Sequence, residues 1–194
     1  MVRDPRRGRR PADHVPGEEG IWVFIFGDLV VFGLFFVTYC YYRSGAVALY
    51  TASQHQLDQM LGLTNTILLL TSSWFIASAL ERARQGARHA DRLILGGIAC
   101  GAGFVVVKFF EYSAKVASGI TLNSSEFYIF YYMYTGIHLL HVIIGLGVLT
   151  YLYSIARQSA TSAGHIRILE GGAVFWHLVD VLWIILFALL YVAR

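Results

Sequence analysis

The chain has 194 residues, of which 57% are hydrophobic, 15% aromatic and only 14% charged, with a formal net charge of +3 at pH 7. Soluble globular domains carry about 25% charged residues, so this composition excludes such a domain and indicates a protein of the lipid bilayer. It also excludes a disordered or fibrous chain, and two cysteines are too few for a disulfide-built fold.

Residues 1–19 are predicted to form a disordered, basic tail on the cytoplasmic side. Five arginines lie within residues 3–10, among prolines at positions 5, 11 and 16, and their charge favours the anionic inner leaflet. The apolar run after the tail resembles a signal peptide, but it is too long, contains Asp28 and has no small-residue cleavage site. We therefore expect a retained first span. Nucleic-acid binding is not expected, because membrane topology accounts for the arginines.

Residues 20–194 are predicted to form one all-α domain, an integral membrane bundle of five transmembrane helices. A helix of about 20 apolar residues crosses the roughly 30 Å of hydrocarbon in a bilayer. Five segments meet this requirement: Ile21–Tyr42, Leu61–Leu80, Leu93–Tyr112, Phe127–Ala156 and Gly172–Val192. The connections between them are short, so no segment is left for a soluble domain.

The first span contains Asp28, a carboxyl group without a basic partner within one turn of its helix. In hydrocarbon such a group must be neutral or hydrogen-bonded to another helix, and it is a functional candidate by default. An interhelical contact is favoured over a place in a proton path. Cys40 and Cys100 lie in the first and third spans without a zinc-binding spacing, and both are expected to be small buried residues in opposite halves of the bilayer.

The second and third spans carry polar side chains of two kinds. The small polar residues of the second span favour a helix-packing face over the lining of a pore; they are Thr64, Asn65, Thr66, Thr71, Ser72 and Ser73. In the third span, Lys108 and Glu111 are three residues apart and therefore share one helix face. We expect an ion pair there, with Lys108 able to extend to the interface. The alternative is that Glu111 bonds a neighbouring helix or a lipid headgroup.

The fourth and fifth spans repeat this spacing in His138 with His141 and in His177 with Asp180. Two imidazoles on facing helices could ligate a haem. The favoured interpretation is that the imidazoles bond Asp180, Glu170 or backbone carbonyls and hold the fourth and fifth helices together. The aromatic run 127–134 is either a lipid-facing belt or a seam against a partner.

The orientation follows from the distribution of Lys and Arg, because short cytoplasmic loops retain positive charge. A cytoplasmic N-terminus puts eleven basic residues inside the cell, against only Arg43, Lys115 and Arg194 outside. We therefore predict that the N-terminus is inside and the C-terminus outside.

Read in order, the spans resemble the subunit III family of haem–copper terminal oxidases. The resemblance covers residues 20–42 (GIWVFIFGDLVVFGLFFVTYCYY), 65–73 (NTILLLTSS), 108–112 (KFFEY), 135–147 (TGIHLLHVIIGLG) and 170–187 (EGGAVFWHLVDVLWIILF). The last two segments follow the specific Gly-x-His-x-x-His-Val and Glu…Trp-His-x-Val-Asp-x-x-Trp patterns. The chain begins at the third helix of the longer members, as in the five-helix bacterial form. Asp28 replaces the usual Glu, which also resembles the accessory subunit III-like protein of bacterial nitric oxide reductases.

The resemblance implies a non-catalytic subunit of an oxidoreductase complex in the bacterial inner (plasma) membrane. Haem and copper would belong to subunit I, beside which this chain would pack together with subunit II, stabilising the complex and supporting proton uptake. It implies lipid or interhelical polar contacts for Glu111, His138, His141, Glu170, His177 and Asp180, and a position near the oxygen or proton route for Asp28. No metal or cofactor is expected in this chain, although a bound phospholipid is possible.

Three other functions stay open from the sequence. The chain could support a nitric oxide reductase instead of an oxidase. It could be a proton-coupled channel or transporter that uses Asp28 and the histidines. It could also be a membrane cytochrome b.

Overall fold

The computed structural model describes residues 19–86, 89–157 and 163–193, and within them it is all-α. Its elements are α1 (Glu19–Gly45), α2 (Val47–Gln54), α3 (Gln59–Arg84), α4 (Ala90–Ala117), α5 (Glu126–Ala156), α6 (Ala163–Phe187) and the π-helical η1 (Ala188–Val192). Five helices are long and apolar enough to cross a membrane. The predicted fold class and the five spans are therefore confirmed. The tail predicted over residues 1–19 lies outside the described residues, except for Glu19.

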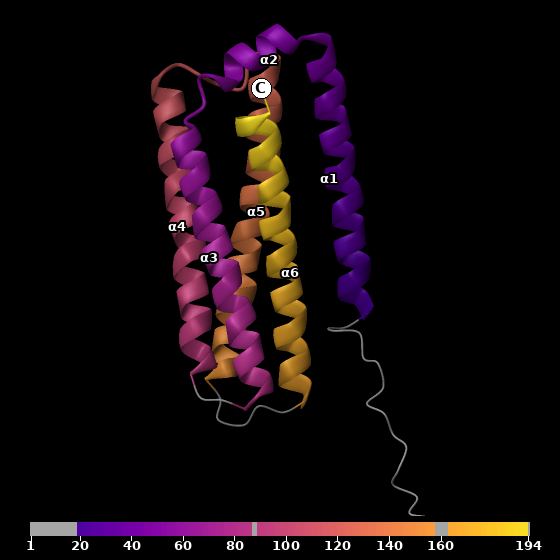
Figure 1. The fold of residues 1–194 in the computed structure, drawn as a ribbon, viewed down its shortest axis with the longest axis vertical. Coiled ribbons are helices and arrows are strands. Elements are labelled where there is room, and N and C mark those ends of the chain that lie inside the picture. Colours follow the sequence, from indigo (N-terminus) through magenta and orange to yellow (C-terminus); the bar gives the residue numbers. More distant parts are fainter. Residues whose placement is uncertain (1–18, 87–88, 158–162, 194) are drawn as a thin grey trace, which may run out of the picture.

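Four of the long helices pack against one another and the fifth stands at the side. In Figure 1, α3, α4, α5 and α6 form the bundle, α1 runs beside α6, and the short α2 lies across one end. This end, called the α2 end below, also holds the connection between α4 and α5 and the C-terminal end of η1. The connections predicted to be extracellular thus lie together; which side of the membrane they face stays a prediction.

The helix boundaries follow local chemistry that an apolar count does not detect. Asp58 caps α3, since its Oδ1 accepts hydrogen bonds from the amides of Met60 and Leu61 at 2.8 and 3.3 Å. Helix α6 begins at Ala163 rather than at the expected Gly172. Its first turns contain Arg167 and Glu170, polar residues that an apolar count leaves out of the span.

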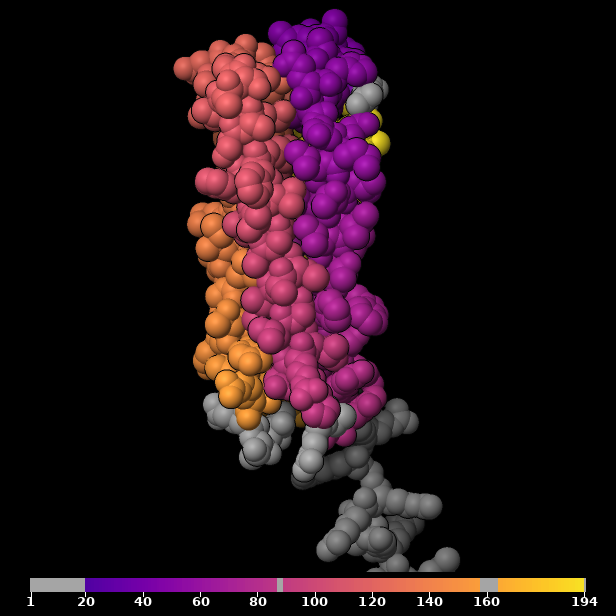
Figure 2. Space-filling model, turned by 90° about the vertical axis from the view of Figure 1, so that its left-hand side faces the viewer, coloured from indigo at the N-terminus to yellow at the C-terminus, as the bar shows by residue number. Residues whose placement is uncertain are grey.

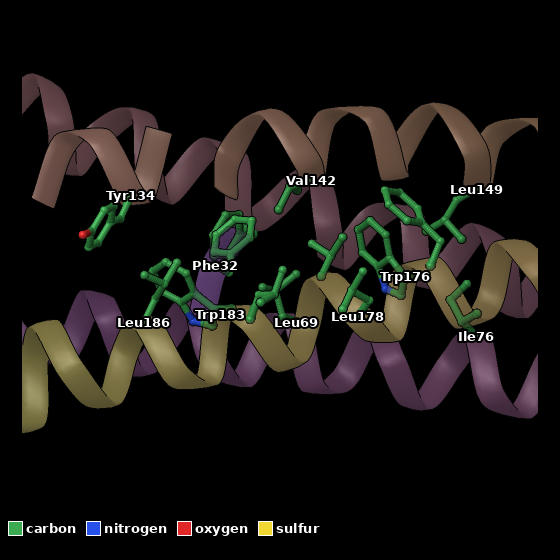
Figure 3. Packing of buried hydrophobic residues seen from close by; sticks show 14 of the residues in the cluster. Phe32, Leu69, Ile76, Tyr134, Val142, Leu149, Trp176, Leu178, Trp183 and Leu186 are labelled. Carbon is green, nitrogen blue, oxygen red and sulfur yellow. The ribbon is translucent and has the colours of Figure 1, made fainter. Parts of the chain in front are cut away.

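The core of the bundle is aromatic, and glycines let the helices approach one another. Trp176 and Trp183 of α6 are completely buried, and Figure 3 shows them among Leu69, Val142 and other apolar side chains. A Cβ atom at Gly145 would lie 2.7 Å from the Trp176 ring. Figure 2 shows α4 packed without a break between α3 and α5.

The fold corrects the expected burial of the two cysteines and decides between the two alternatives for the aromatic run 127–134. Cys40 is exposed and Cys100 is half-buried, so the prediction that both are buried is wrong. Cys40 lies on α1, which has the smallest buried share of the five described spans. The aromatic run of α5 faces the bundle, where Phe127, Tyr131 and Tyr134 are fully buried. It is therefore a seam within this chain.

Candidate functional site

Three clusters of polar side chains lie inside the bundle, and the first is a buried ion pair near the α2 end. Lys108 Nζ lies 2.8 Å from Glu111 Oε2, and the two side chains are 0% and 2% exposed. Lys108 also donates to the hydroxyl of Tyr191 at 2.9 Å. The hydroxyls of Tyr131 and Tyr191 donate to Glu111 Oε1 at 2.8 and 2.6 Å. The expected ion pair is present, and Glu111 also bonds two neighbouring helical segments.

Aromatic rings surround the ammonium group of Lys108. Its Nζ lies 4.7 Å from the ring centroid of Trp183 and 5.4 Å from that of Tyr191, distances at which ring quadrupoles attract a cation. Extension of Lys108 to the interface is therefore a wrong expectation. Tyr131 and Tyr191 were missed because tyrosines in apolar runs are typical of interfacial belts. The spacing of Tyr131, Thr135 and His138 on one helix face was the available signal.

A polar cavity borders this ion pair on the side of the α2 end. Its volume is about 230 Å³, and its lining includes Asp58, Glu111 and Lys115. Lys115 Nζ donates to the backbone carbonyl of Gln56 at 3.2 Å. The cavity therefore brings a polar space next to the buried carboxylate.

The second cluster joins α1, α5 and α6. His141 Nδ1 lies 2.8 Å from the carbonyl of Ile137 and must carry a proton, because a carbonyl only accepts. His141 Nε2 lies 3.2 Å from Asp28 Oδ2, which accepts no aligned hydrogen bond from the described residues. The Asp28–His141 pair thus brings a carboxyl group and an imidazole together from α1 and α5 at membrane depth.

His138 lies one turn before His141 and has a different environment. Its Nε2 donates to the carbonyl of Val179 at 3.0 Å, which connects α5 to α6. The ring is fully buried between Phe104 and Trp183. The expected bond between the fourth and fifth spans is therefore made by His138.

The third cluster lies between α3 and α6. His177 Nδ1 is 2.6 Å from Ser73 Oγ and 3.9 Å from Asp180 Oδ2. Toward the other end of the bundle, Arg84 of α3 pairs with Glu170 at 2.8 Å. His177 and Glu170 therefore make interhelical polar contacts, but with α3, whereas the expected partner was the fourth span. The spacing of residues on one helix does not show which neighbouring helix it meets.

Small polar residues of α3 form further hydrogen bonds with α4 and α6. Ser72 Oγ donates to the carbonyl of Gly97 at 2.7 Å and accepts from Trp176 Nε1 at 3.1 Å. Thr66 Oγ1 accepts from Trp183 Nε1 at 3.1 Å. Asn65 is also buried, although neither of its amide atoms has a hydrogen-bond partner among the described residues. These contacts agree with the packing face predicted for the second span.

A haem held by two histidines needs two imidazole nitrogens free to point at one iron. His138 uses Nε2 for the Val179 carbonyl, and His141 uses both ring nitrogens within the protein. Neither the polar cavity nor the apolar cavity described next is lined by a histidine. Within the described residues, no three potential metal ligands gather.

A larger, apolar cavity of about 510 Å³ lies between α1, α5 and α6, at the end opposite α2. Its walls include Phe24, Val148 and Phe175, and Arg167 lies on its border. An apolar space with one cation at its edge suits an acyl chain beneath an anionic headgroup.

Comparison with known proteins shows one family over nearly the whole chain. Residues 16–193 match the family described as cytochrome c oxidase subunit III. The chain is 29% identical to the cytochrome bo(3) ubiquinol oxidase subunit 3 of Pseudomonas putida, over 89% of this chain and 83% of that protein. It is 30% identical to the cytochrome c oxidase subunit 3 of Synechocystis sp., over 89% of this chain and 73% of that protein.

A longer relative carries the same region as one part of a larger chain. The heme-copper oxidase subunit I+III of Aeropyrum pernix is 29% identical over 93% of this chain. The match covers only 23% of that protein's own length.

Proposed function

Because the chain belongs to the cytochrome c oxidase subunit III family, we propose that it acts as the non-catalytic subunit III of a haem–copper terminal oxidase in the bacterial plasma membrane. The observation that carries the proposal is the family match, which includes all five spans. As subunit III of such an oxidase, the chain is part of an oxidoreductase complex. Its own role is to stabilise the catalytic subunit and to support proton uptake.

The partner is subunit I, which supplies the haem and copper, together with subunit II. A relative whose name gives subunits I and III as one chain supports a permanent association between the two. The geometry supports a structural role, because the imidazoles of His138, His141 and His177 are used for contacts between or within helices.

Copurification from native membranes tests the choice of partner. The tagged chain is extracted in mild detergent, and the proteins bound to it are identified by mass spectrometry. We expect a haem–copper oxidase subunit I. Recovery of a nitric oxide reductase catalytic subunit in its place would show that the chain is a subunit of that enzyme.

Two measurements on the purified chain test functions of other classes. A haem band in the reduced-minus-oxidised spectrum that disappears in His177→Ala would refute the non-catalytic assignment. Proton flux into liposomes containing only this chain, blocked by Asp28→Asn, would indicate a channel or transporter. We expect neither.

Support of proton uptake is assigned to the Asp28–His141 pair, because it places a carboxyl group 3.2 Å from an imidazole nitrogen at membrane depth. In the assembled oxidase, Asp28→Asn is expected to lower turnover and proton uptake while subunit retention stays normal. Asp28→Glu keeps the carboxyl group and is the matched control. Equal rates in Asp28→Asn and the unaltered complex would remove this role.

The apolar cavity between α1, α5 and α6 is assigned to a phospholipid. Its walls suit an acyl chain, and Arg167 suits the phosphate. Lipid analysis of the purified complex should find less anionic phospholipid in Arg167→Gln than in a control, Arg82→Gln, whose arginine is exposed on α3. Equal lipid content would contradict the assignment.

A further inference from the structure

One exposed stripe of α6 has an ionisable residue at the middle of the membrane span. His177, Val181 and Ile184 follow one another at helical spacing and therefore lie on one face of α6, and the exposed Ala188 follows as the first residue of η1. The side chain of His177 is 37% exposed, and Val181 and Ile184 are 48% and 41% exposed. Figure 1 shows α6 between α3 and α1, both of which contact it. Between residues 172 and 188, the exposed residues are Val181, Ile184 and Ala188.

The depth of His177 makes lipid an unfavourable neighbour. His177 lies ten residues after Arg167, the residue assigned to a lipid phosphate, so the nearer interface is about 15 Å away along the helix. That distance exceeds the reach of an imidazole toward the interface. Ionisable side chains at such depth almost always face protein or a water-filled cavity.

One ring nitrogen of His177 is left to bond another chain. Nδ1 is used by Ser73, whichever of the two atoms carries the shared proton. None of the described residues forms a hydrogen bond with Nε2. Asp180 stands behind the ring, with Oδ2 3.9 Å from Nδ1 and both carboxyl oxygens without an aligned donor. The imidazole is therefore held through Nδ1, and its side chain is 37% exposed.

We infer that this stripe of α6 is the surface on which a transmembrane helix of the catalytic subunit packs, with a polar group of that helix bonded to His177 Nε2. The inference rests on the proposed function and adds the contact face. Subunit I is the occupant because a relative carries subunits I and III in one chain. The apolar residues of the stripe, Val181, Ile184 and Ala188, match the apolar surface of a membrane helix. The single polar position fixes the register of that helix.

Photocrosslinking in native membranes tests the face directly. A benzoylphenylalanine residue replaces Val181 or Ile184, and control variants carry it at Val106 of α4 or Leu140 of α5, which are also exposed near the middle of their helices. After irradiation, the adducts of the tagged chain are identified by mass spectrometry. We expect subunit I at Val181 and Ile184, and lipid at Val106 and Leu140.

The outcomes separate the contact face from the proposed function. Adducts with subunit I at a control position but not on the stripe would overturn the inference and leave the function standing. A second copy of this chain or lipid on the stripe would also overturn it. Absence of subunit I from every adduct and from the copurified proteins would refute the function itself.

Variants of His177 test the role of Nε2. The amide of Gln occupies the Nε2 position of an imidazole, whereas the amide of Asn occupies the Nδ1 position. His177→Gln should therefore retain subunit I, while His177→Asn keeps only the contact with Ser73. We expect His177→Asn and His177→Leu to lower the amount of subunit I per tagged chain by about fivefold, the size of one polar contact between membrane helices. Equal retention in all three variants would contradict the bond.

Discussion

Lys108 and Glu111 lose their hydration on folding, because both side chains are buried inside the bundle. Removal of one partner from a buried ion pair costs about 3–5 kcal/mol, whereas replacement of both by apolar groups is often neutral. We expect Glu111→Gln to lower the free energy of unfolding by about 3 kcal/mol, measured by titration with denaturing detergent. The double variant Lys108→Met, Glu111→Leu should recover most of this loss. Wild-type stability in Glu111→Gln would contradict the role of the pair.

Gly145 is a second residue at which the structure makes a sharp prediction. A Cβ atom there would lie 2.7 Å from the ring of Trp176, which is fully buried and cannot move aside. We expect Gly145→Ala to destabilise the protein by about 1–3 kcal/mol through overpacking. Gly147→Ala is the control on the same helix, since nothing lies within 4 Å of its Cβ position. Equal thermal unfolding temperatures for the two variants would show that α5 and α6 have room to separate.

At the scale of elements, α1 differs from the other long helices in how little of it is covered. Only 11% of an apolar stretch of 18 residues in α1 is buried, against 56% for the corresponding stretch of the last span. Its contacts include the Asp28–His141 pair and the bond from the Tyr134 hydroxyl to the carbonyl of Phe35 at 2.6 Å. Local openings are easiest where few apolar contacts are lost. In the purified chain, we expect backbone amides of α1 to exchange hydrogen faster than those of α6. Equal protection of the two helices would contradict this order of local stability.

The membrane-spanning helices could be predicted from the sequence wherever their residues are apolar. All five spans were found in this way, but the start of α6 was placed too late, because Arg167 and Glu170 are helical although polar. The neighbours of polar residues were less predictable. The Lys108–Glu111 pair lies within one helix and could be derived from spacing. The bond from His177 to Ser73 joins two helices, and its register depends on packing that a single sequence does not state.

At the scale of the whole molecule, the connections between the helices lie at two opposite ends of the bundle. The distribution of Lys and Arg predicts which end faces the cytoplasm. In a background of Cys40→Ser and Cys100→Ser, single cysteines at Asn123 and Gln85 report the two ends, since both residues are exposed. A membrane-impermeant maleimide should label Asn123→Cys in intact cells and Gln85→Cys only after the membrane is opened. The reverse result would invert the predicted orientation.

The order in which a ribosome makes this chain gives the ion pair a further consequence. Tyr191 follows Glu111 by 80 residues, and its hydroxyl is bonded to both Lys108 and Glu111. Until α6 and η1 have entered the membrane, Lys108 and Glu111 lack the hydroxyl of Tyr191 and the nearby ring of Trp183, although Tyr131 of α5 is already present. The early helices of the nascent chain are therefore incomplete on their own. Insertion of the last span is the step that closes the charge site, and a chain arrested before it would present a recognisable polar defect to membrane quality-control proteases.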